Sequence, residues 1–230
     1  MSFDDIPMVM GDFVSPECRD ELRNRYKDFY PYSHNVVTTR NGRYVNASWI
    51  DSPSRKNRYI ATQSPLPNTF SDFWHMVWEN RVQTILMLTK FSEGPKLKAH
   101  YYWPSIPGES VHFEDNLKVK LLDIMESTCI EQRRFLLTKD GQTHTVYHYH
   151  YLGWPDYGVP RDHDDMDTLL SLMENDETPT IVHCSAGVGR TGTLIALHIH
   201  KDHPHIPLLD LIRKLRRQRL YMVGHPEQYD

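Results

Sequence analysis

A glycine-bearing loop between an expected strand and an expected helix constrains this fold more than any other stretch of the chain. The loop runs from His183 to Gly192 and reads HCSAGVGRTG. Before it, Thr180-Ile181-Val182 is a β-branched apolar run typical of a buried strand. After it, the apolar stretch 193–197 is typical of the start of a helix. Backbone N–H groups converge at such a junction and the helix dipole adds partial positive charge, so the sequence predicts an anion-binding loop.

Cys184 and Arg190 stand near the two ends of this loop. Because a helix N-terminus and a nearby guanidinium both lower the pKa of a thiol, we expect Cys184 to be a thiolate at neutral pH. The planar guanidinium of Arg190 matches two oxygens of a phosphate. A thiolate facing a bound phosphate indicates phosphoryl transfer through a cysteinyl-phosphate. The alternative is that Cys184 is an inert, buried hydrophobe, the usual role of an unpaired cysteine.

The composition is that of an ordinary globular protein. The 230 residues suffice for one sizeable domain, and we expect a single domain over 1–230. Hydrophobic residues make up 39% and charged residues 24% of the chain, and the net charge is −4. These values exclude a disordered chain and argue against nucleic acid as a partner.

The cysteines and the hydropathy of the chain indicate in which cellular compartment the protein works. Cys18, Cys129 and Cys184 form no recognisable disulfide framework. No apolar stretch is long enough to span a membrane, and we expect no signal peptide. A cytoplasmic or nuclear location is therefore predicted, because a reactive thiolate needs a reducing compartment.

Hydrophobic periodicity predicts a mixture of helices and strands. Residues 70–78 place apolar side chains at i, i+3, i+4, i+7 and i+8, as an amphipathic helix does. Helices are also expected over Pro16–Tyr30, 165–175 and 207–218. Short strands are expected over 44–50, 58–62 and 84–88, and longer alternating ones over 117–124, 133–138 and 143–151. The sum predicts an α/β (α+β) fold, a twisted mixed sheet flanked by helices.

Trp154-Pro155-Asp156 supplies a second motif. Together with the loop 183–192 it resembles the protein tyrosine phosphatases, whose mobile acid loop and signature loop carry these sequences. The resemblance extends from about Asn24 to Tyr229, through segments 24–28, 44–48, 59–69, 98–104 and 228–229. It implies a cysteine-dependent catalytic domain that acts, without metal or organic cofactor, on proteins that contain phosphotyrosine. A monomer is the default expectation for its oligomeric state.

The resemblance implies the catalytic roles. Cys184 attacks phosphorus while Asp156 protonates the leaving oxygen, and Asp156 then acts as the base toward water. Arg190 and the loop amides stabilise the equatorial oxygens of the phosphoryl group. Gln228 positions the hydrolytic water.

Supporting and substrate-binding roles follow from the same resemblance. His183 tunes the thiolate, Thr191 donates a hydrogen bond to the sulfur, Glu93 braces Arg190, and Lys98 reaches toward the acid loop. Tyr26 stacks on the substrate ring and Asp28 holds the substrate backbone. The phosphate-binding amides belong to Ser185, Ala186, Gly187, Val188 and Gly189, and Arg216 falls where related enzymes hold a second acidic or phosphorylated residue.

The residues also bear on substrate class. Positions 185–189 carry no lysine, whereas phosphoinositide phosphatases with this loop tend to place lysines there. A deep cleft walled by Tyr26 would admit phosphotyrosine and exclude the shorter phosphoserine. The alternatives are a dual-specificity phosphatase and a phosphotyrosine-binding pseudophosphatase.

Several departures from the family pattern stand out. Gly224 occupies the position where the family usually has an earlier glutamine, and it has no side chain to order a water. This puts the rate of the second, dephosphorylation step in question. Segments 154–184 and 197–207 look shorter than usual, and the chain stops at Asp230, which suggests a compact or trimmed member.

Two further patterns have ordinary interpretations. His144, His148 and His150 share one face of an expected strand, and a second histidine cluster spans 198–205. Because neither has partners at a recognisable ligand spacing, we expect surface histidines and no metal. The basic run 213–219 is typical of a solvated helix face, with Arg216 as its candidate functional member.

Overall fold

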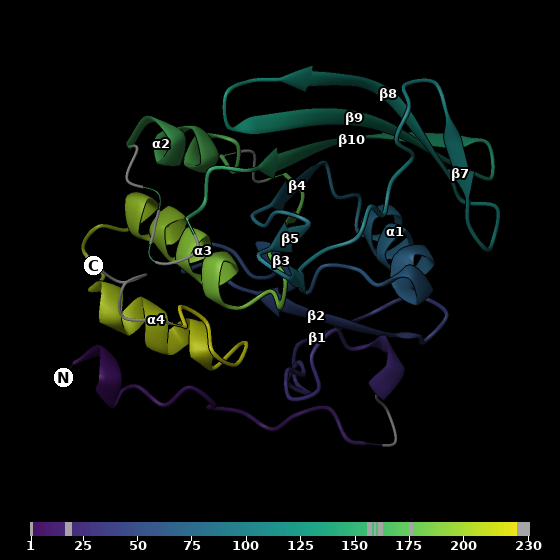
Figure 1. Ribbon diagram of the computed structural model, residues 1–230. Coiled ribbons are helices and arrows are strands. Elements are labelled where there is room, and N and C mark those ends of the chain that lie inside the picture. Colours follow the sequence, from purple (N-terminus) through teal and green to yellow (C-terminus); the bar gives the residue numbers. More distant parts are fainter. Residues whose placement is uncertain are drawn as a thin grey trace.

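The computed structural model describes residues 2–16, 20–155, 158, 160, 163–174 and 177–224. Within these ranges nine strands form one sheet in the order β1-β2-β3-β11-β4-β10-β9-β8-β7 (Figure 1). The strands are β1 (Val36–Thr38), β2 (Tyr44–Ile50), β3 (Tyr59–Thr62), β4 (Thr84–Met87), β7 (Ser110–His112), β8 (Lys118–Glu126), β9 (Ile130–Lys139), β10 (Gln142–Tyr151) and β11 (Thr180–His183). A separate two-stranded hairpin joins β5 (Ser92–Glu93) to β6 (Lys96–Leu97).

The centre of the sheet is parallel and its two sides are antiparallel. β11 pairs in parallel with β3 and β4, and β4 pairs in parallel with β10. Every residue of β3 and β11 is buried, as expected for strands covered on both faces. The flanking pairs β1–β2, β2–β3, β7–β8, β8–β9 and β9–β10 are antiparallel. This mixed sheet confirms the predicted fold class.

Helices cover the sheet on opposite sides. They are α1 (Phe70–Glu79), α2 (His163–Ser171), α3 (Gly189–Asp202) and α4 (Leu208–Arg216). Figure 1 shows α3 and α4 on one side of the central strands and α1 on the other. Val182 packs in a core cluster with residues of α2, α3 and α4, whereas Ile181 packs in a second cluster with residues of α1. Successive β11 side chains therefore feed the two cores alternately.

Most expected elements are present with small shifts at their ends. Residues 70–78 form α1, where Phe73, Trp74 and Val77 are almost completely buried. The three long alternating segments form β8, β9 and β10. The expected helix 207–218 ends earlier, at Arg216, and the expected helix 165–175 corresponds to α2, with residue 175 outside the described residues.

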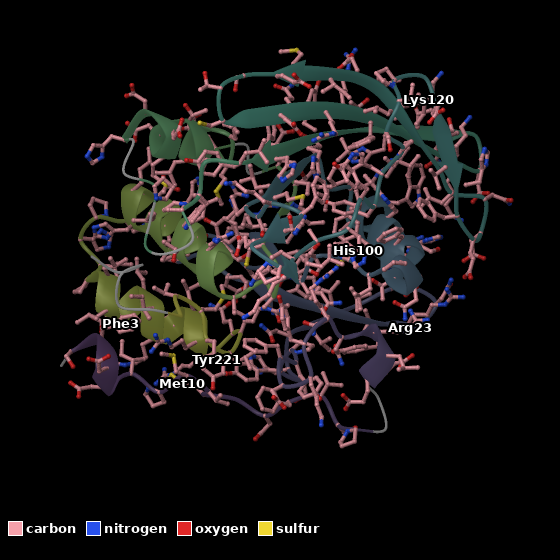
Figure 2. All side chains as sticks on the ribbon, in the orientation of Figure 1. Phe3, Met10, Arg23, His100, Lys120 and Tyr221 are labelled. Carbon is pink, nitrogen blue, oxygen red and sulfur yellow. The ribbon has the colours of Figure 1, made fainter. Side chains whose placement is uncertain are left out.

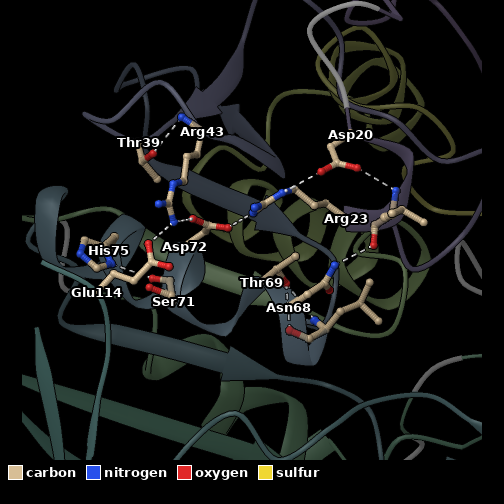
Figure 3. Close-up of polar contacts among 12 residues, drawn as sticks. Asp20, Arg23, Thr39, Arg43, Asn68, Thr69, Ser71, Asp72, His75 and Glu114 are labelled. Carbon is tan, nitrogen blue, oxygen red and sulfur yellow. Dashed lines mark hydrogen bonds and ion pairs between the residues drawn. The ribbon is translucent and has the colours of Figure 1, made fainter.

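The helix expected over Pro16–Tyr30 is wrong for residues 20–30, where the structure has a 3-10 turn at Glu21–Arg23 (residues 17–19 lie outside the description). Asp20 caps this turn through Leu22 N, and Arg23 forms an ion pair with Asp72 of α1 (Figure 3). The local cap and the ion pair to a distant helix hold this segment in turns instead of a helix.

The N-terminal segment passes along α4. Figure 2 shows Phe3, Met10 and Tyr221 on this side of the molecule. The Met10 N–H donates to the Tyr32 hydroxyl at 2.9 Å, and the Tyr221 N–H donates to the Met8 carbonyl at 2.8 Å. The N-terminal segment is therefore tied to the residues that follow α4.

The surface position expected for the histidines is wrong for His148, His150 and His198, which are buried. Among the described residues, no group of three His, Cys, Asp or Glu side chains is arranged to hold a metal ion. No helix in that part of the chain is both long and apolar enough to cross a bilayer.

Candidate active site

The predicted anion loop lies between the end of β11 and the start of α3, as the sequence indicates. Gly187 has φ +74°, and a Cβ there would lie 2.1 Å from the Thr62 carbonyl oxygen of β3. A Cβ at Gly192 would lie 2.5 Å from the Val223 nitrogen. Glycine is therefore required at both positions, by backbone conformation and close approach at the first and by close approach at the second.

Cys184 lies at the base of the loop and is 6% exposed. Its sulfur accepts a hydrogen bond from the Thr191 hydroxyl at 3.3 Å. Burial by itself would raise the pKa of the thiol, but hydrogen bonds from the Thr191 side chain and from the backbone N–H groups of Thr191 and Val188 oppose it. With the positive charge of Arg190 added, the pKa of Cys184 falls below its ordinary value.

Arg190, near the start of α3, is held by groups that lie outside the loop 183–192. Its Nη1 pairs with Glu93 Oε1 at 2.5 Å and donates to the Leu88 carbonyl at 3.3 Å. Its Nη2 lies 3.4 Å from the Pro155 carbonyl, at the start of the segment expected to carry the acid. Lys98 Nζ lies 3.7 Å from Glu93 Oε2. One carboxylate thus orients both cations beside the loop.

Tyr26 reaches the loop through Ser185. The Ser185 hydroxyl donates to the Lys98 carbonyl at 2.7 Å, and it lies 2.6 Å from the Tyr26 hydroxyl. Because a serine hydroxyl has one hydrogen, the Tyr26 hydroxyl must be the donor in the second contact. Arg25 anchors the same segment by donating to the carbonyls of Ser64 and Pro65. The Tyr26 ring is thereby fixed as one wall of the site.

A cleft of about 330 Å³ opens above the loop. Its floor is formed by Cys184 and Arg190, and its walls include Tyr26, Phe29 and Lys98. The rings of Tyr26 and Phe29 meet edge to face, with centroids 5.8 Å apart. The cleft therefore combines an apolar aromatic wall with a positively charged floor, which suits an aromatic phosphate ester.

His183 contacts the nucleophile through the backbone. Its Nδ1 lies 3.0 Å from the Cys184 carbonyl oxygen and its Nε2 lies 2.8 Å from the Tyr102 hydroxyl. Complete burial lowers the pKa of His183 to about 3, so the ring is neutral. His183 therefore brings no positive charge to the Cys184 sulfur. Its contact with Cys184 is through the backbone carbonyl of that residue.

Arg216 is a correction to the sequence interpretation. Its side chain is completely buried, and its guanidinium donates to the carbonyls of Ile6, Met222 and Val223. The Phe3 ring stacks below it, with the guanidinium carbon 4.6 Å from the ring centroid. Because these contacts occupy Arg216 away from the cleft, it fastens the N-terminal segment to the residues after α4 and does not face substrate.

Arg219 is the arginine of the basic run that reaches the loop, and the sequence analysis did not single it out. Its buried guanidinium donates to the carbonyls of Gly187 at 2.8 Å and Ala186 at 3.1 Å. Ser48 and Asn46 of β2 accept its remaining hydrogen bonds. Burial lowers the pKa of Arg219 to about 10, so it remains charged at neutral pH. One signal was available, since position 219 continues the i, i+4 apolar stripe through Leu211 and Leu215.

Three expected site residues have no contact described in this cleft. Asp28 is exposed, two residues beyond Tyr26. Asp156 and Gln228 lie outside the described residues. The segment before Gly224 packs on the loop, where the Val223 N–H donates to the Val188 carbonyl at 3.3 Å.

Comparison with known proteins assigns the family. The chain belongs to the protein-tyrosine phosphatase family, whose model matches residues 20–230. It is 35% identical over 246 residues to the phosphatidylinositol phosphatase PTPRQ of Homo sapiens, covering 99% of this chain and 10% of that protein. It is 34% identical to tyrosine-protein phosphatase non-receptor type 2 of Homo sapiens, covering 97% of this chain and 56% of that protein.

A third relative is receptor-type tyrosine-protein phosphatase S of Gallus gallus, which is 37% identical over 223 residues. That match covers 90% of this chain and 14% of that protein. The chain therefore spans between about a tenth and somewhat more than half of the lengths of these relatives.

Proposed function

We propose that this chain hydrolyses phosphotyrosine in proteins through a cysteinyl-phosphate intermediate. One observation carries the proposal: the Cys184 thiol, with its pKa lowered, shares the floor of an aromatic-walled cleft with Arg190. A nucleophile and a phosphate-binding cation at the base of one cleft are what this reaction requires. The cysteinyl-phosphate mechanism is general for the family to which the chain belongs.

The first step transfers the phosphoryl group to sulfur. The Cys184 thiolate attacks phosphorus as the bond from phosphorus to the phenolic oxygen breaks, and that oxygen takes a proton from Asp156. Arg190 and the amides of residues 185–189 bind the equatorial oxygens, where they stabilise negative charge in the transition state. The aromatic ring of the substrate lies against Tyr26, and Asp28 binds its backbone.

The second step regenerates the thiol. Water placed by Gln228 gives its proton to the Asp156 carboxylate and attacks phosphorus, the bond to sulfur breaks, and phosphate leaves. Gly224, beside the loop, offers no side chain to hold this water. We therefore expect the second step to limit turnover.

Phosphotyrosine is preferred to a phosphoinositide as the substrate. One relative is named a phosphatidylinositol phosphatase, while others are named tyrosine-protein phosphatases. The loop positions of this chain carry no lysine for an inositol ring with several phosphates. The nearest lysine on the cleft wall, Lys98, already faces Glu93. The aromatic wall and the single cationic floor favour an aryl phosphate.

The test is turnover of p-nitrophenyl phosphate with and without vanadate, followed by phosphotyrosyl peptide, phosphoseryl peptide and phosphatidylinositol phosphate as substrates. We expect vanadate-sensitive hydrolysis and a strong preference for the phosphotyrosyl peptide. Equal rates on the phosphoseryl peptide would indicate dual specificity. Tight phosphopeptide binding without turnover would indicate the pseudophosphatase, which Gly224 favours as the second candidate.

The remaining expectations are part of the same proposal. Residues 1–230 act as one catalytic domain and as a monomer, because the nucleophile, the cation and the proposed acid all belong to one chain. Neither metal nor organic cofactor is needed when side chains supply these groups. We place the reaction in a reducing compartment, the cytoplasm or the nucleus, with phosphotyrosine proteins and not nucleic acid as partners.

A further inference from the structure

A buried histidine on β10 contacts the tyrosine that in turn contacts His183. His148 is completely buried, and its Nε2 lies 2.8 Å from the Tyr102 hydroxyl. The same hydroxyl lies 2.8 Å from His183 Nε2, and His183 Nδ1 lies 3.0 Å from the Cys184 carbonyl oxygen. Three consecutive contacts therefore join β10 to the backbone of the nucleophile.

A count of hydrogens fixes the direction of every contact. A carbonyl oxygen can only accept, so His183 carries its hydrogen on Nδ1 and its Nε2 is bare. The Tyr102 hydroxyl must then donate its single hydrogen to His183. Because that hydrogen is used, the contact with His148 requires that His148 Nε2 carry a hydrogen and donate it to the Tyr102 oxygen. The chain runs from His148 to Tyr102, His183 and Cys184 in one direction.

The surroundings keep His148 in this single neutral form. Burial lowers the pKa of His148 well below its ordinary value, and the charge of Arg133 on β9 lowers it further. The other titratable groups around the ring are His150 of β10, His183 of β11 and Tyr102. Among the described residues, Nδ1 of His148 has no hydrogen-bond partner outside its own residue, so no neighbouring side chain competes for the orientation of the ring.

We propose that His148 is a positioning residue of the nucleophile loop, because its Nε2–H holds the Tyr102 hydroxyl as a donor to His183 and thereby holds the Cys184 carbonyl toward the core. In a trans peptide the carbonyl and the following N–H point in opposite directions. Holding the Cys184 carbonyl inward therefore aims the Ser185 N–H away from the core. The thiolate and the bound phosphate are then stabilised by an amide rather than opposed by a carbonyl.

The strand offers a matched control. His144 lies four residues before His148 and therefore on the same face of β10, and its Nε2 lies 2.7 Å from the Val82 carbonyl. It makes the same kind of histidine contact, but its carbonyl partner belongs to a residue just before β4 and not to the loop. A general effect of removing a histidine from this strand would therefore appear in both positions.

The experiment compares His148→Asn, His148→Gln and His144→Asn by the rate at which iodoacetamide alkylates Cys184, followed by peptide mass spectrometry, as a function of pH. An asparagine amide ends near the Nδ1 position and cannot reach Tyr102, whereas a glutamine amide can place an N–H near Nε2. We expect His148→Asn to raise the pKa of the thiol by roughly 0.4 to 1 unit, the worth of one hydrogen bond. His148→Gln and His144→Asn should follow the parent profile.

A second variant keeps the test decisive if His148→Asn fails to fold. Tyr102→Phe removes the hydroxyl with little change in volume, and it should raise the thiol pKa by at least as much as His148→Asn. The proposal is overturned if the pH profile of His148→Asn superimposes on that of the parent, or if His144→Asn shifts the profile equally. It is also overturned if folded His148→Gln shifts the profile by the same amount as Tyr102→Phe.

The inference rests on the proposed function only for its catalytic consequence. Alkylation reports the thiol pKa whether or not the protein hydrolyses any phosphate ester. If the parent protein showed no aryl phosphatase activity while His148→Asn still shifted the thiol profile, the proposed function would fail and the positioning role would stand. With activity present, kcat of His148→Asn should fall about twofold to tenfold, as expected for the loss of one such hydrogen bond.

Discussion

The two sides of the loop 183–192 differ in what holds them. On the side facing the core, the carbonyls of Cys184, Ala186 and Gly187 accept hydrogen bonds from His183 and Arg219. On the side facing the cleft lie the Cys184 sulfur and the Arg190 guanidinium. The core side is fixed by buried donors, whereas the cleft side presents reactive and charged groups to solvent.

This difference between the core side and the cleft side explains how the loop can bind an anion. Successive carbonyls drawn to one side leave the N–H groups of the same peptides on the other side, where they form a cradle for negative charge. The polar groups that achieve this are remote from substrate and must be buried to work. Changes on the cleft side should therefore cost rate alone, and changes on the core side should cost stability as well as rate.

The largest expected effect comes from Cys184→Ser on the cleft side. Turnover should fall below detection because a serine hydroxyl is not ionised at neutral pH, while phosphopeptide affinity and the urea midpoint should be retained. Kinetics, calorimetry and urea unfolding measure the three quantities, and Cys129→Ser is the control that should keep full activity. Undiminished turnover by the Cys184→Ser protein would contradict the mechanism.

Asp156→Ala should cost roughly a hundredfold to ten-thousandfold in kcat/KM on a phosphotyrosyl peptide, the usual range for a lost general acid. The loss should be smaller for p-nitrophenyl phosphate, whose leaving group needs less protonation. Asp167→Ala, at an exposed position on α2, is the control. Equal losses of kcat/KM on both substrates would argue against proton donation by Asp156 to the leaving group.

Arg219→Met tests the core side. It leaves the carbonyls of Ala186 and Gly187 buried without their donor, so the free energy of unfolding should fall by about 1 to 3 kcal/mol. The folded fraction should also lose phosphate affinity, measured by vanadate inhibition. Arg217→Met is the matched control, since Arg217 is the exposed arginine two residues earlier. An Arg219→Met protein with full stability and no activity would contradict the expectation that changes on the core side cost stability as well as rate.

Thr191→Ala gives the smallest expected change. Losing the hydroxyl that donates to sulfur removes one of the contacts that lower the thiol pKa, so that pKa should rise. The acid limb of kcat/KM should move to higher pH, because a higher pKa leaves less thiolate at any given acidic pH, with a loss of about tenfold or less. Thr193→Ala removes a hydroxyl that bonds to the Gly189 carbonyl and should leave the limb in place.

Sequence reasoning succeeded where local pattern and structure agree. The strand, loop and helix around Cys184 follow from a β-branched run, glycines and an apolar stretch in immediate succession. The amphipathic period of residues 70–78 likewise produces α1. It failed for residues 20–30, where Arg23 and Arg25 bind groups far away in the sequence and the chain forms turns instead of a helix.

Arg216 and Arg219 illustrate the same limit within the site. Both are arginines in one short basic run, and composition gives no reason to distinguish them from the exposed Arg217. Their roles depend on which carbonyls the chain brings within reach after α4, at Met222 and Val223 for one and at Ala186 and Gly187 for the other.

By itself the sequence predicted the family, the cysteine and arginine of the loop, and the order of the main elements, because these depend on residues adjacent in the chain. Only the tertiary structure brought Arg219 to the carbonyls of the loop and His148 to the tyrosine that contacts His183. The physical reason is that a buried donor acquires its role from the acceptor it meets, and that acceptor comes from a distant part of the chain.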